Sequence, residues 1–260
     1  MINLLAAFIL GIVQGITEWL PISSTAHMLI FDRFIRLEIS QDARSFFFVV
    51  VQLGSILAVI VLYFKDLWPN TRAKWMMWAK IAVATVPLVG ISLFWTDALE
   101  GRLQAMSVIA LALIAYGVVF ILVETIGRNR KPRIDSIYSV SFLDSLALGL
   151  FQSLSVIPGT SRSGSTIMGG RLLGLSRQTA AKFSFFMAIP AMAGASLLKV
   201  MDTGLAFNAL EWAVIAVGCL TSFAVSLVVL KSLMDYVKSH TFVLFGIYRI
   251  VLAAALLLFL

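Results

Sequence analysis

The sequence predicts an all-α polytopic membrane protein that forms a single membrane domain over residues 1–260. Two observations predict this class. Hydrophobic residues make up 60% of the chain and charged residues only 13%, with a mean hydropathy of +0.99, whereas about a quarter of the residues in a soluble domain are charged. The apolar residues also gather in runs of about 17–25 residues, the length that carries a helix across a bilayer.

Six apolar runs are long enough to become transmembrane helices: residues 43–64, 77–95, 105–125, 180–200, 211–231 and 242–260. Two further apolar stretches, 2–36 and 140–175, each contain a proline beside several small hydroxyl residues. Proline breaks a helix because it removes a backbone donor, and broken helices at membrane depth are tolerated only inside protein or beside a wet cavity. We therefore expect two re-entrant helical hairpins, each with a polar break at its tip.

The two broken stretches resemble each other, and the spans that follow them keep the same order. Gln14 aligns with Gln152 and Pro21 with Pro158, an offset of about 137 residues. We therefore expect repeat one over 1–127 and repeat two over 138–260, each a hairpin followed by three spans. Three spans cross the membrane an odd number of times, so the second repeat should have the inverted topology. Broken helices that meet near the midplane of such repeats form binding sites for ions or anions.

The basic residues predict the orientation of the domain. Most of them fall in loops on one side of the predicted membrane, within residues 65–80, 128–133, 171–182 and 231–238. Lysine and arginine favour cytoplasmic loops, so both termini should lie outside. The net charge of +7 follows from these loops, and we expect a lipid bilayer and no nucleic acid as partner. The single cysteine, Cys219, offers neither a disulfide nor a metal cluster.

The first polar break carries an acid and a histidine. Gln14 and Glu18 are four residues apart and share one helix face, and acids inside membranes are usually functional. The hydroxyl residues Ser23, Ser24 and Thr25 follow the break and precede His27. A histidine suits proton transfer near neutral pH.

The second polar break has the composition of an anion site. Gly159 permits a tight turn, and Arg162 carries a planar fork of donors that matches phosphate oxygens. The short helix that follows presents free N–H groups at its N-terminus, which favour an anion. Hydroxyl donors come from Thr160, Ser161, Ser163, Ser165 and Thr166. We predict a phosphate site at mid-membrane that is assembled from both tips.

At these motifs the chain resembles the undecaprenyl-pyrophosphate phosphatase (bacitracin-resistance) family of bacterial membrane proteins. A Glu/Gln-x-x-x-Glu motif occupies residues 14–18, a Leu-Pro-x-Ser-Ser-Thr-x-His string residues 20–27, and Pro-Gly-x-Ser-Arg-Ser-x-x-Thr residues 158–166. The resemblance implies an enzyme of the plasma (inner) membrane that hydrolyses undecaprenyl pyrophosphate to undecaprenyl phosphate and inorganic phosphate. Such an enzyme recycles the lipid carrier for cell-wall synthesis and lowers sensitivity to bacitracin. The resemblance also implies a divalent cation, magnesium or calcium.

We assign roles at the predicted site from these residues and this resemblance together. Glu18 would hold the cation or orient the attacking group, with Gln14 as a weaker candidate ligand. Ser24 is the candidate nucleophile with His27 as its base, and direct attack by His27 or by water stays open. Arg162 would clamp the diphosphate, and the predicted phosphate-binding residues are Ser23, Thr25, Gly159, Thr160, Ser161, Ser163 and Thr166.

Two positions depart from the pattern of the family. Many members carry Glu at the position of Gln14, and many carry an acid at the position of Phe48. Glu18 is then the one obvious carboxylate within the motifs. Two further polar sites stay undecided. Gln52 would either support close helix contact or lend an amide to the site, and Arg249 would pair with an acid or bind lipid phosphate.

A transporter is the alternative class, because inverted repeats and broken helices are typical of carriers. The same site would then flip a polyprenyl phosphate across the membrane, and an enzyme with both activities is consistent with the sequence. Release of phosphate by the purified protein separates the classes, because a pure flippase releases none. The oligomeric state is not fixed by the sequence, and a homodimer is one allowed state.

We expect the loop around Asn129 to face the cytoplasm. A cysteine introduced there, in a Cys219→Ser background, should resist an impermeant thiol reagent in intact cells because basic loops stay inside. A cysteine added at either terminus should react readily. Labelling at position 129 together with protection at both termini would reverse the orientation.

Overall fold

The computed structural model describes every residue except 93, 95–102, 104, 128–130 and 259–260. The regular elements of the described residues are all helices, and one isolated bridge joins Ile134 to Leu175. The predicted all-helical class is therefore confirmed. The elements are α1 Ile2–Thr17, α2 Ser24–Phe34, α3 Gln41–Leu62, α4 Phe64–Leu67, α5 Arg72–Ser92, α7 Met106–Ile126, η1 Ile137–Ser139, α8 Phe142–Ser153, η2 Leu154–Val156, α9 Arg162–Leu172, α10 Arg177–Thr203, α11 Ala209–Ser239 and α12 Val243–Leu258.

Five helices are long and apolar enough to cross a membrane: α3, α5, α7, α10 and α11. They correspond to five of the six predicted spans, although α11 extends over 31 residues where 211–231 was expected. The sixth predicted span, 242–260, corresponds to the 16-residue apolar helix α12. The predicted spans 77–95 and 242–260 include residues 93, 95, 259 and 260, which lie outside the described part of the chain. The chain is therefore a polytopic membrane protein by length and composition of its helices.

Each polar break separates two short helices. Residues 18–23 separate α1 from α2, and residues 154–161, which include η2, separate α8 from α9. Ser23 and Ser161 stand directly before α2 and α9 with φ of 73° and 71°, a left-handed conformation that no other non-glycine residue of the described chain adopts. The Ser23 side chain accepts a hydrogen bond from the Ala26 N–H, and Ser161 accepts one from the Gly164 N–H. The two tips thus begin their second helices with the same strained, capped serine.

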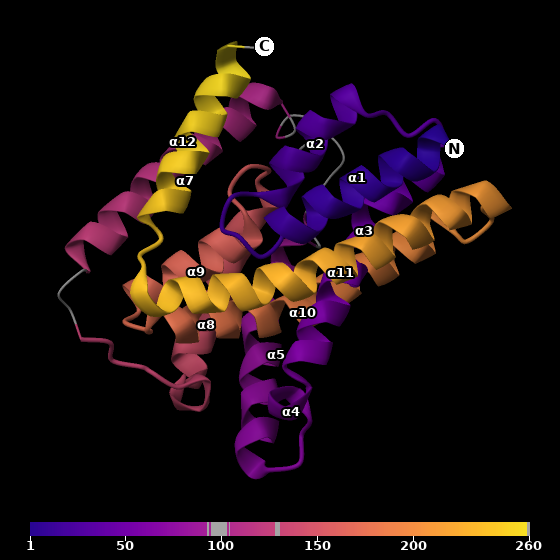
Figure 1. Ribbon diagram of the computed structural model, residues 1–260. Coiled ribbons are helices and arrows are strands. Elements are labelled where there is room, and N and C mark those ends of the chain that lie inside the picture. Colours follow the sequence, from indigo (N-terminus) through magenta and orange to yellow (C-terminus); the bar gives the residue numbers. More distant parts are fainter. Residues whose placement is uncertain (93, 95–102, 104, 128–130, 259–260) are drawn as a thin grey trace.

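The first helix of each predicted repeat packs against a helix of the other repeat. Helix α1 lies against α11, and α8 lies against α5, while α7 and α12 form a pair at one side of the molecule (Figure 1). Small residues permit this close packing. A Cβ added to Gly117 of α7 would come within 2.7 Å of the Gly246 carbonyl oxygen of α12, and one added to Gly54 of α3 within 2.2 Å of the Cys219 carbonyl oxygen of α11.

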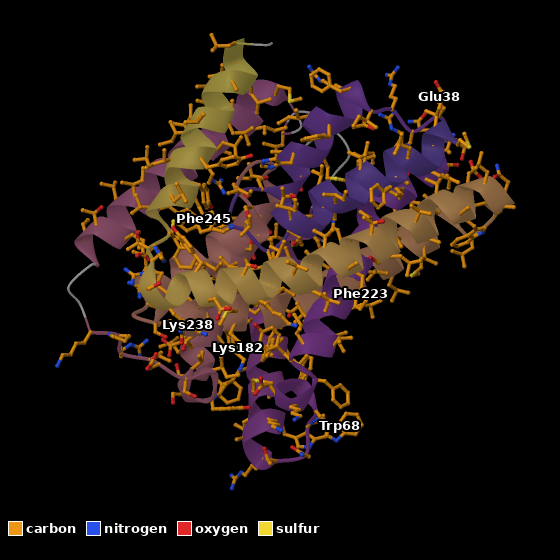
Figure 2. All side chains as sticks on the ribbon, in the orientation of Figure 1. Glu38, Trp68, Lys182, Phe223, Lys238 and Phe245 are labelled. Atoms are coloured by element: carbon orange, nitrogen blue, oxygen red, sulfur yellow. The ribbon has the colours of Figure 1, made fainter. Side chains whose placement is uncertain are left out.

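Helix α10 forms the centre of the bundle and contacts α3, α5, α9 and α11. Its side chains Phe183, Phe185 and Phe186 are fully buried. Both termini lie in the upper part of the view, away from α4 and the beginning of α5 (Figure 1). Glu38 lies near the N-terminus and Trp68 at the opposite end (Figure 2). Both tips contact the central helix α10, the first through Trp19 against Phe185 and the second through Arg162 at the Ser184 carbonyl oxygen.

Candidate active site

The two tips face a common cavity of about 180 Å³. Ser23, Ser24 and Thr25 line it from the first tip, and Ser161, Arg162 and Ser163 line it from the second. Helices α2 and α9 begin at Ser24 and Arg162, so the N-terminus of each helix lies at the cavity. The first N–H groups of a helix lack partners within it and favour an anion. Residues of both tips thus surround one cavity, as the sequence predicted, and phosphate binding there stays a prediction.

Glu18 is the acidic centre of the site and is only 4% exposed. Its Oε1 accepts a hydrogen bond from Arg162 Nη2 at 2.8 Å. Its Oε2 accepts from Gln14 Nε2 at 2.9 Å and from the Ser24 hydroxyl at 2.8 Å. A buried carboxylate with these partners can hold a negative charge at low cost. Glu18 thereby joins the first helix, the first tip and the second tip.

Arg162 completes the pair from the second tip. Its Nη1 donates to the Ser184 carbonyl oxygen of α10 at 3.0 Å, and its guanidinium lies over the Trp19 ring at 5.7 Å. The Nε atom is buried and has no partner within the described residues. Arg162 also lines the cavity, and these contacts hold its guanidinium in place there.

Ser163 fastens the two tips together beside this pair. Its hydroxyl donates to the Glu18 carbonyl oxygen at 3.1 Å and approaches the Leu20 carbonyl oxygen at 3.3 Å. Gly159 carries the turn before α9 with φ of 95°, and a Cβ there would come within 2.6 Å of the Ile109 carbonyl oxygen. The second tip therefore needs glycine at this position for both conformation and space.

Comparison with known proteins identifies the family. A sequence model described as "Bacitracin resistance protein BacA" matches residues 7–255. The chain belongs to the BacA family.

Individual relatives match the whole chain at similar levels. The "Undecaprenyl-diphosphatase 1" of Clostridioides difficile is 47% identical over 265 residues, which cover 99% of this chain and 96% of the relative. The "Undecaprenyl-diphosphatase" of Enterococcus faecalis is 45% identical, covering 99% and 97% of the two chains. That of Streptococcus agalactiae is 44% identical, covering 100% and 97%. These matches cover nearly the whole of this chain and of each relative.

His27 occupies a different place in this BacA family member from the one predicted. Its Nδ1 lies 2.7 Å from the Ser23 carbonyl oxygen, and its Nε2 lies 2.7 Å from the Tyr248 hydroxyl of α12. Because a carbonyl oxygen only accepts, Nδ1 carries a proton, and Nε2 of the neutral ring accepts from Tyr248. Ser24 instead donates to Glu18. Among the described residues Glu18, rather than His27, therefore lies within hydrogen-bond distance of Ser24, and the role of His27 as base stays a prediction.

Two predicted phosphate ligands do not line the cavity. The Thr160 hydroxyl donates to the Leu154 and Ile157 carbonyl oxygens and closes the second tip. The Thr166 hydroxyl lies 2.6 Å from the Ser184 hydroxyl, behind the tip. Both hydroxyl groups therefore stabilise the fold of the second tip. Gln14 donates to Glu18 and lines a neighbouring cavity, so it contacts the site through Glu18.

Arg249 is the residue that we expected to pair with an acid or to bind lipid phosphate. It is fully buried in α12, and no acid pairs with it among the described residues. Its Nη1 donates to the Pro21 carbonyl oxygen at 3.1 Å, and its Nη2 donates to those of Gly159 and Thr160 at 2.6 and 3.0 Å. The Tyr116 ring covers the guanidinium at 5.4 Å. One arginine therefore binds both tips from behind.

A signal for Arg249 was present in the sequence, since a charge inside an apolar run needs a partner. The partners of Arg249 are the backbone carbonyl groups of Pro21 and of the two residues that follow Pro158. A pattern of side chains in the sequence does not reveal such partners. Gln52 and Ser155 also line the cavity. Gln52 therefore borders the site, while its Nε2 donates to the Phe48 carbonyl oxygen within α3.

We expect Arg249→Met to misalign the two tips. The change leaves three buried carbonyl oxygens without a donor, each at a cost of about 1–3 kcal/mol, so the thermal midpoint in detergent should fall. Arg249→Lys should recover part of the loss because it keeps one donor and the charge. Equal midpoints for wild type and Arg249→Met would show that the tips are held by other contacts.

Proposed function

We propose that this protein is an undecaprenyl-diphosphatase that removes the terminal phosphate of undecaprenyl pyrophosphate. Relatives with that name match this chain over nearly their whole length. The observation that carries the proposal is the cavity itself, where Arg162 and the N-termini of α2 and α9 face one space of about 180 Å³. Released undecaprenyl phosphate would return to cell-wall synthesis, and less pyrophosphate would remain for bacitracin to bind.

The terminal phosphate would lie between the two helix N-termini. Arg162, which lines the cavity, would donate to its oxygens, and Thr25, Ser23 and Ser161 would add hydroxyl donors. Donors fixed by the protein before substrate arrives stabilise the charge that spreads over the transferring phosphoryl group. The Arg162–Glu18 pair and the Ser184 contact keep this fork in place.

We propose Ser24 as the nucleophile, with Glu18 as its base. The Ser24 oxygen would attack the terminal phosphorus while its proton passes to Glu18 Oε2, which accepts it at 2.8 Å. The bond from phosphorus to the bridging oxygen breaks, and undecaprenyl phosphate leaves. Water then attacks the phosphoserine, the bond from phosphorus to the Ser24 oxygen breaks, and Glu18 returns its proton to that oxygen. Inorganic phosphate leaves with the oxygen and protons of the water. In the alternative, water attacks directly and Ser24 is a ligand.

A divalent cation fits this site as a partner of the substrate. The described residues contain no group of three or more His, Cys, Asp or Glu side chains that would hold a metal alone. Magnesium is commonly held by one or two carboxylates together with substrate phosphates. Glu18 would hold the cation, with the Gln14 amide oxygen as second ligand. The cation, when bound, would neutralise charge on the diphosphate.

We also propose that the chain is an inverted repeat whose site opens to the outer face. The reciprocal contacts of α1 with α11 and of α8 with α5 support the repeat, as do the paired serines at the two tips. The same features favour a second candidate, a polyprenyl-phosphate flippase. A homodimer stays a prediction.

Purified protein in detergent should release phosphate from undecaprenyl pyrophosphate, and a chelator should stop the release until magnesium or calcium is restored. Ser24→Ala should remove activity because no other group at the first tip contacts Glu18 in the same way. Thr25→Ala, the matched control, should cost about tenfold or less. No release by the wild type would favour the flippase. A Ser24→Ala variant that keeps a third of the activity or more would leave serine as a ligand and favour attack by water.

A further inference from the structure

A second, larger cavity adjoins the candidate active site. It measures about 630 Å³, and its walls share Ser24, Thr25, Gln52, Ser155 and Pro158 with the inner cavity. We call it the vestibule. The five shared residues make the two spaces neighbours with a common wall, so a molecule in the inner cavity would extend into the vestibule.

Helix α10 connects the two cavities with one face. Ala191 and Ala195 line the inner cavity, and Lys199 lines the vestibule. These residues follow each other at intervals of four, which places them in a row along one side of the helix. The row ends at Lys199, near the C-terminus of α10 at Thr203. The lysine therefore marks the end of the vestibule that lies farther from Arg162 along this helix.

Lys199 is the one charged side chain among the described residues that line the vestibule. Its side chain is 22% exposed, and its Nζ lies 3.1 Å from an oxygen of Asp202, which is itself 73% exposed. Exposed pairs of this kind contribute little and separate readily. The ammonium group is thus available to an anion that enters the vestibule.

No acidic side chain lines the vestibule among the described residues. Phe48 and Val49 of α3 line the vestibule together with Met28 and Leu29 of α2. Among the described residues, the vestibule thus has one positive charge, and its walls combine these apolar side chains with polar ones such as Ser45 and Gln52. Such lining suits the phosphate end of an isoprenoid better than a free metal ion.

Resting on the proposed function, we propose that the vestibule is a second anion subsite, in which Lys199 binds a diphosphate group before its terminal phosphate reaches Arg162. The ligand class is a phosphate or diphosphate anion, carried on a lipid or free in water. A positive charge at the rim of a site raises the rate of association and its salt dependence. It acts on binding and leaves the chemical step, at Ser24 and Glu18, unchanged.

The test measures phosphate release from farnesyl pyrophosphate and its competitive inhibition by inorganic pyrophosphate, both in detergent. Lys199→Gln should raise KM and the inhibition constant by about fivefold with kcat unchanged, and about 0.5 M salt should reduce the difference. Lys199→Arg should stay within about twofold of wild type, while Lys199→Glu should be weaker than Lys199→Gln. Lys231→Gln, an exposed lysine of α11, should change nothing.

Three results would overturn the subsite. Unchanged constants in Lys199→Gln would mean that the lysine meets no substrate anion. Equal defects in Lys199→Arg and Lys199→Gln would indicate a packing role. A change in KM for the lipid without a change in inhibition by pyrophosphate would assign the lysine to the membrane surface. If the wild type released no phosphate, calorimetric titration of inorganic pyrophosphate into wild type and Lys199→Gln would still test the subsite alone.

Discussion

The contact between Glu18 and Arg162 is the interaction on which the site depends. It joins two tips that lie 144 residues apart in the chain, and both partners are nearly excluded from solvent, with side-chain exposures of 4% and 10%. Two charges that are buried separately would each cost several kcal/mol. Together, with Gln14, Ser24 and the Ser184 carbonyl group as further partners, they satisfy each other. The pair is therefore a condition for bringing the two polar breaks together inside an apolar bundle.

Two helices of the bundle, α12 and α10, support this contact. Arg249 holds the carbonyl groups of both tips from α12, and Tyr248 next to it fixes His27 at the base of the first tip. Ser184 of α10 meets both Arg162 and Thr166. The strained Ser23 and Ser161 persist because these contacts define their surroundings. A site held this firmly offers fixed donors to a phosphate, as electrostatic catalysis requires.

The two tips are alike in shape and different in chemistry. Gln14 and Gln152 occupy matching positions, but Gln14 supports Glu18, whereas position 156, four residues after Gln152, is Val156. Gln152 is buried, and neither of its side-chain polar atoms has a partner within the described residues. One tip supplies the acid and the candidate nucleophile, and the other supplies the arginine. Two similar segments thus make one asymmetric site.

Much of this arrangement could be predicted from the sequence, because hydropathy gives the helices and proline with small hydroxyl residues gives the breaks. Glu18 and Arg162, which meet across the tips, followed from the cost of placing charge in a membrane, and Ser24 followed from its place in the first polar break. Partners that are backbone groups could not be predicted. His27 pairs with a carbonyl and with Tyr248, 221 residues away, and Arg249 pairs with carbonyls alone. Thr160 and Thr166 carry the residue type of a phosphate ligand, but their hydroxyl groups turn toward the fold.

The most direct test of the central claim is a double-mutant cycle across the two tips. Glu18→Asp and Arg162→Lys are mild enough to leave measurable phosphate release, and kcat/KM is determined for each variant and for the pair. If the two residues act as a unit, the double variant should lose much less than the product of the single losses, with a coupling free energy of about 1 kcal/mol or more. Independent, multiplicative losses would contradict the account.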